Sequence, residues 1–125
     1  MKFRGVRGAI TVEENTAGAI WSATAELLQA LIAANGIEED DVASVIFSCT
    51  PDLNAAYPAK AARDLGWRQV ALMGCVEMDV PGGVPRCIRV LIHWNTAKPA
   101  GDIRHCFLRG AVVLRPDLIA EKQEE

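Results

Sequence analysis

A single long amphipathic segment, residues 17–35, separates the first strand-like run of this 125-residue chain from the others and limits its possible folds. Its apolar residues recur at steps of three and four and are Ile20, Ala23, Leu27, Leu31 and Ala34. Thr16 precedes the segment as a predicted N-cap, and Gly36 follows it as a left-handed stop. The sequence therefore predicts one long helix that buries one face.

Strand-like runs surround this helix. They are residues 2–12, 42–49, 70–76 and 86–94, and residues 103–114 contain the last strand or strands. Pro58 suits the first turn of a short helix that ends before Gly66. Strands that alternate with one long helix and one or two short ones indicate an α+β fold with a mixed sheet. We expect one domain over residues 1–118 and a flexible tail over residues 119–125.

Composition excludes several classes of protein. Half of the residues are apolar and 23% are charged, which is typical of an ordinary globular protein. The net charge of −3 leaves no basic surplus for nucleic acid. We see no apolar run long enough for a membrane span and no signal peptide, so we expect a cytoplasmic protein. The four cysteines form no C-x-x-C pair, so we expect buried free thiols and no metal site.

Three arginines, Arg7, Arg89 and Arg115, lie in runs that otherwise read as buried strand. Arginine is rarely buried without a partner, and it stays charged at any working pH. Three buried arginines require either three carboxylate partners or one anionic ligand between them. The strand-like runs contain few Asp and Glu residues, so we favour a site for a small, multiply charged anion.

Seven segments, in order along the chain, point to a known family. They are RGVRGA at 4–9, TPDL at 50–53, YPAKAAR at 57–63, EMDV at 77–80, GG at 82–83, CIRV at 87–90 and VLRPDL at 113–118. Together they resemble the monofunctional chorismate mutases of the small, trimeric α/β-barrel type, over about residues 3 to 118. The resemblance implies a homotrimeric pseudo α/β barrel with active sites between subunits. It also implies an isomerase that rearranges chorismate to prephenate, in phenylalanine and tyrosine biosynthesis, without a metal or cofactor.

The resemblance also implies roles for individual residues. Arg89 would meet the ether oxygen and one carboxylate, Arg7 would pair with a carboxylate, and Glu77 would accept the ring hydroxyl. The substrate-binding residues implied are Tyr57, Ala59, Lys60, Arg63, Leu72, Met73, Gly74, Phe107, Leu114 and Arg115. Two positions depart from the family pattern. Phe107 stands where tyrosine is common, and Gly74 stands where relatives can have a cysteine, with Cys75 one place later.

Other interpretations remain open at this point. Arg89 could form a structural ion pair with Glu77 or Asp79, and Lys60 and Arg63 could belong to a solvated helix face. The function could instead be that of a non-catalytic trimer that binds an anionic metabolite in the same cleft. It could also be that of an enamine or imine hydrolase on a similar fold. That chemistry needs water activation, and Glu77 is the one obvious general base.

Overall fold

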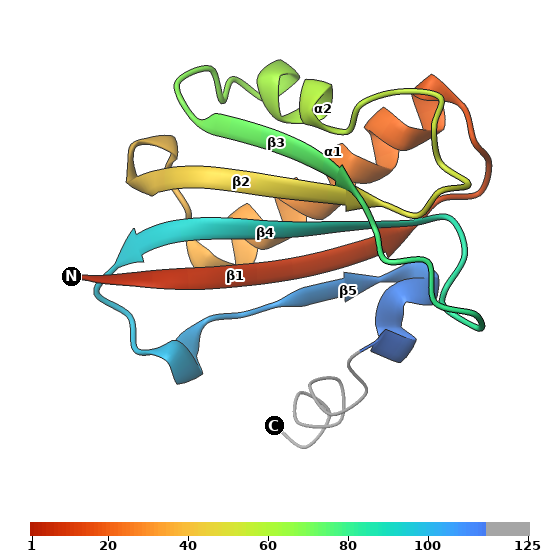
Figure 1. Cartoon of the computed structure of the whole chain (residues 1–125). Coiled ribbons are helices and arrows are strands. Elements are labelled where there is room, and N and C mark those ends of the chain that lie inside the picture. The colour runs from red at the N-terminus through yellow and green to blue at the C-terminus, as the bar shows by residue number, and fades with distance from the viewer. Residues whose placement is uncertain (115–125) are drawn as a thin grey trace.

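The computed structural model describes residues 1–114, which form one five-stranded sheet with helices on one face (Figure 1). The strands are β1 (Lys2–Thr11), β2 (Val42–Cys49), β3 (Ala71–Val76), β4 (Cys87–Thr96) and β5 (Cys106–Leu108). The α-helices are α1 (Ala17–Asn35) and α2 (Ala59–Asp64). Short 3-10 turns lie at Glu39–Asp41, Ala100–Asp102 and Arg109–Leu114.

The sheet is mixed, in the order β3-β2-β4-β1-β5. The central strand β4 is antiparallel to both β1 and β2, whereas β3 pairs parallel to β2 and β5 parallel to β1. The α+β class predicted from the sequence is confirmed. Because β2 and β3 end where β4 begins, the segment from Glu77 to Arg86 crosses that end of the sheet (Figure 1).

Helix α1 begins and ends at the predicted residues. The hydroxyl of Thr16 accepts a hydrogen bond from the backbone N–H of Ala19, and Gly36 adopts a φ of 73°. By length and composition α1 could cross a membrane, which the sequence analysis did not anticipate. In the structure Ile20, Leu27 and Leu31 are fully buried in the main hydrophobic cluster, so α1 serves as the core helix of this sheet.

Strand alternation gives the sheet one buried face and one open face. Side chains such as Val6, Phe47 and Val90 point into the core beside α1. The opposite face is open over much of its area, and Met73 there is 58% exposed. At the β5 end of this face a second, smaller cluster of Ala9, Cys87, Phe107 and Ala111 is buried, and Leu114 packs against it. Phe3, on the same side of β1, is also 58% exposed. The functional side chains lie on this open face.

The strand expected within residues 103–114 is present as β5, but the reading of the run before Arg115 as strand is wrong. Residues Arg109–Leu114 form a 3-10 turn instead. Arg109 adopts a φ of 53°, and the backbone N–H of Gly110 donates to the Thr11 hydroxyl over 3.0 Å. This turn takes the chain off the sheet edge after Leu108, so the ladder between β5 and β1 stays short. Arg115 and the predicted tail at 119–125 lie outside the described residues.

Candidate active site

The sheet register brings Arg7 and Arg89 to the same open face. Arg89 pairs with Ala9 across the β1–β4 ladder, and Arg7 lies two residues before Ala9 on the same side. Arg7 and Arg89 are thus diagonal neighbours across two antiparallel strands, and the backbones of such residues are typically about 7–8 Å apart. The Arg89 side chain is 47% exposed and Arg7 is also exposed, so the expectation that these two arginines are buried is wrong. The surrounding run is apolar because its alternate residues face α1, while the arginines face outward.

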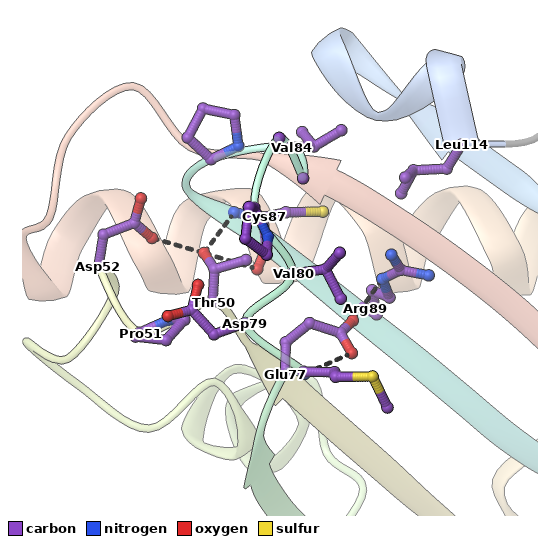
Figure 2. A pocket seen from close by; sticks show the side chains of 15 residues that line it. Thr50, Pro51, Asp52, Glu77, Asp79, Val80, Val84, Cys87, Arg89 and Leu114 are labelled. Carbon is purple, nitrogen blue, oxygen red and sulfur yellow. Dashed lines mark hydrogen bonds and ion pairs between the residues drawn. The ribbon is translucent and has the colours of Figure 1, made fainter.

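Glu77 fixes the orientation of Arg89. Its Oε2 forms an ion pair with Nε of Arg89 (Figure 2). The same oxygen accepts a hydrogen bond from the Ser48 hydroxyl over 3.3 Å. Its Oε1 accepts from the backbone N–H of Met78 over 3.1 Å. The ion pair between Arg89 and Glu77, which the sequence analysis kept as an alternative, is therefore present. It uses only Nε, and within residues 1–114 the terminal nitrogens of Arg89 make no hydrogen bond.

Two hollows meet at this ion pair. One, of about 300 Å³, is bordered by Arg7, Glu77, Arg89, Phe107 and Leu114. The other, of about 550 Å³, lies under the loop from Met78 to Pro85 and shares Glu77, Arg89 and Leu114 with the first. Figure 2 shows Arg89 between Glu77 and Leu114. The arrangement offers two cationic groups beside a carboxylate in a concave surface, which suits a small anionic ligand.

A polar network holds the rim of the larger hollow. Asp52 accepts hydrogen bonds from the backbone N–H of Arg86, a residue with a φ of 46°, and from the Thr50 hydroxyl. Desolvation acts to raise the pKa of Asp52, but these hydrogen bonds and the Arg86 charge outweigh it and lower that pKa. Asp52 thus lies in a turn and ties the Thr50 and Arg86 segments together at this rim.

The remaining predicted site residues lie apart from Arg89, around β3 and α2. Tyr57 is 81% exposed and borders a separate hollow of about 470 Å³ together with Gly74. Met73 lies exposed on the edge strand. Ala59 and Leu72 are partly buried and pack against the core.

The two cations of α2 differ in their contacts. Lys60 forms an ion pair with Asp64 over 2.7 Å, and its Nζ lies 4.6 Å from the centroid of the Trp21 ring. Arg63 is exposed, and within residues 1–114 its side chain makes no hydrogen bond or ion pair. The structure thus divides the predicted site residues into two groups that one chain does not bring together.

Sequence reasoning missed Ser48 and misjudged Cys75. Ser48 pairs with Arg89 on one side and with Cys75 on the other, so all three share the open face. Cys75 was predicted to be buried, but it is exposed and borders both the Arg89 hollow and the Tyr57 hollow. Cys75 lies two residues after Met73, and side chains two apart on a strand point to the same face. The prediction that Met73 binds substrate could therefore have assigned Cys75 to the same face.

The other cysteines are better shielded, and all four are free thiols. Burial raises the pKa of the Cys49 thiol to about 11, with Cys75 and Cys87 acting in the same direction. Burial also raises the pKa of Cys87. Among residues 1–114, no group of three or more His, Cys, Asp or Glu side chains is arranged to hold a metal ion.

Comparison with known proteins decides the family. The sequence model of the family described as chorismate mutase type I matches residues 3–118. The chain belongs to the chorismate mutase type I family. The resemblance inferred from the seven motifs is confirmed, and so are the predicted class of enzyme and its isomerase reaction, chorismate to prephenate.

Individual chorismate mutases agree with this over nearly their whole lengths. The chain is 54% identical over 116 residues to chorismate mutase AroH of Thermus thermophilus, covering 92% of this chain and 95% of that one. It is 46% identical over 126 residues to chorismate mutase AroH of Bacillus subtilis, covering 100% and 99%. The solved chorismate mutase from Clostridium thermocellum superposes with a TM-score of 0.86 at 51% identity, covering 87% of this chain and 97% of that one.

Proposed function

We propose that chorismate binds in the hollow of Arg7, Glu77 and Arg89, and that these three residues carry the reaction. The observation that supports this most is the convergence of two outward-facing arginines and one carboxylate on one concave surface. Chorismate is a dicarboxylate with a ring hydroxyl and an ether oxygen. Two cations suit its carboxylates and ether oxygen, and a carboxylate suits its hydroxyl.

The rearrangement is unimolecular and transfers no proton to the protein, so the site acts by holding a compact conformer and by placing charge. The ether oxygen gains negative charge as its bond to carbon breaks. The terminal nitrogens of Arg89 would stabilise this charge more strongly in the transition state than in the substrate. Because Glu77 holds Arg89 through Nε, the guanidinium is oriented before the substrate arrives.

We further propose a cyclic homotrimer in which a neighbouring subunit supplies Tyr57, Ala59, Lys60 and Arg63, with Met73 and Gly74 nearby. Two features support it. Strand β3 is an edge strand whose Met73 and Val76 are 58% and 73% exposed, and such edges attract a partner. The 300 Å³ hollow is also at the small end for a ligand pocket, as expected of half a site.

The activity is tested directly. Purified protein is incubated with chorismate, loss of the diene absorbance is followed, and prephenate is identified as the product. We expect multiple turnovers without added metal or cofactor, and we place the enzyme in cytoplasmic phenylalanine and tyrosine biosynthesis. Binding without turnover would support the non-catalytic binder instead. Hydrolysis of imines but not conversion of chorismate would support the hydrolase.

Sharing of the site between subunits is tested by complementation. Arg89→Ala and Arg63→Ala each damage a different half of the site, so each homotrimer should be impaired. After co-refolding at equal amounts, roughly a quarter of the interfaces in a random cyclic assembly combine two intact halves. Activity should rise toward that fraction of wild type. If native mass spectrometry detects mixed trimers and no activity returns, the site is not divided in this way.

A further inference from the structure

Helix α2 depends on contacts outside itself. It has only six residues, and its N-cap, Pro58, provides no side-chain hydrogen bond. A helix this short is unstable in isolation, so tertiary contacts must hold it. Within α2, Ala61 and Ala62 are buried, which secures one side of the helix. The outer side, which carries Lys60, needs another anchor.

Trp21, on α1, meets this segment at two points. Its indole N–H donates to the backbone carbonyl of Tyr57 over 3.1 Å, one residue before the N-cap Pro58. The face of its ring lies 4.6 Å from the Lys60 ammonium, within range of a cation–π interaction. The side chain of Lys60 is further restrained by Asp64, at 2.7 Å. One tryptophan therefore restrains both the backbone of Tyr57 and the charge of Lys60.

We infer that Trp21 is a positioning residue for substrate binding, because it holds Tyr57 and Lys60 where they complete the site of a neighbouring subunit. This rests on the proposed function, in which both residues bind substrate. Trp21 itself touches no substrate. Its loss should therefore weaken substrate binding and raise KM. The rate at which bound substrate reacts, kcat, is set by Arg89 and should stay close to wild type.

Three substitutions separate the two contacts. Trp21→Phe keeps an aromatic ring and removes the N–H, so KM should rise about twofold to tenfold, the usual contribution of one hydrogen bond. Trp21→Leu also removes the ring, and KM should rise about twofold to fivefold more, as expected for an exposed cation–π pair. Lys60→Met keeps the aliphatic stem without the charge. In the Lys60→Met background, Phe and Leu at position 21 should therefore give equal KM values.

Trp94 provides a matched control. It also has a lysine over its ring, with Nζ of Lys98 at 5.7 Å from the centroid. Its indole nitrogen has no hydrogen-bond partner among residues 1–114, and it lies on β4 away from α2. Trp94→Phe removes an aromatic N–H without disturbing Tyr57, so KM should stay at the wild-type value. Thermal unfolding of each variant identifies effects that come from stability alone.

The outcomes distinguish the inference from the proposed function on which it rests. If Lys60→Met and Tyr57→Ala both leave KM unchanged, the proposed placement of these residues is wrong, and the inference fails with it. If these two variants raise KM but Trp21→Phe does not, only the inference is overturned. It is also overturned if Trp21→Phe lowers kcat in proportion to lost folded protein, as a purely structural residue would.

Discussion

Replacement of Arg89 should remove most of the activity and little of the stability. A preorganised charge stabiliser contributes about 100-fold to 1,000-fold in rate, or about 3–4 kcal/mol. The side chains of Arg89 and Glu77 are 47% and 22% exposed, so their ion pair is partly screened by solvent. Its loss should therefore lower the free energy of unfolding by at most about 1 kcal/mol. Glu77 would also keep its hydrogen bonds from Ser48 and Met78.

Arg89→Lys is the sharper variant. Arginine pairs with Glu77 through Nε and keeps two terminal nitrogens for the substrate, whereas lysine has one ammonium group for both tasks. We therefore expect Arg89→Lys to keep the charge and still lose most of the rate. A slow variant with an intact charge would indicate that orientation, as well as charge, accelerates the reaction.

The assay is kcat at saturating chorismate, beside urea unfolding of the same preparations. Arg68→Ala is the control, because Arg68 is exposed and makes no hydrogen bond or ion pair within residues 1–114. It should match wild type in both measurements. A near-normal kcat for Arg89→Ala would refute the role of this cation. A loss of unfolding free energy as large as the loss of activation free energy would indicate a structural role instead.

Four further results are expected. Values of kcat should be nearly flat from about pH 6 to 9 and unchanged by chelators, because arginine stays charged and no proton is transferred; a bell-shaped profile would contradict this. Asp52→Asn should lower stability at pH 7, because the folded-state pKa of Asp52 is lowered. In urea titrations the difference should begin to shrink as pH falls below about 3.9, the unfolded value, and should be lost as pH falls through the lower folded-state pKa. The side-chain oxygen of Asn15 accepts two backbone hydrogen bonds, each 3.0 Å, from the loop before Tyr57. Asn15→Ala removes this acceptor and should lower the free energy of unfolding by about 1 kcal/mol. Asn15→Asp keeps the acceptor and should not show this loss. Alkylation followed by mass spectrometry should leave Cys49 unmodified at pH 8, because its pKa is about 11.

The sequence by itself determined the elements and the family. Thr16 and Gly36 marked the ends of α1 because caps depend on residues one turn away. The strand β2 was predicted at its observed bounds, and the short helix α2 at its start, for the same local reasons. Seven motifs in order then indicated the chorismate mutase family without any coordinates, because their residue types and spacing are specific when taken together.

Only the tertiary structure decided which side chains meet. The outward direction of Arg7 and Arg89 depends on strand register, and a shift of one residue would turn both into the core. The contact of Trp21 with Tyr57 joins positions that no local pattern connects. The run before Arg115 was apolar enough for a strand, yet the turn at Arg109 and the contact of Gly110 with Thr11 took it off the sheet. Local chemistry sets each element, but contacts between distant segments set the face that each side chain presents.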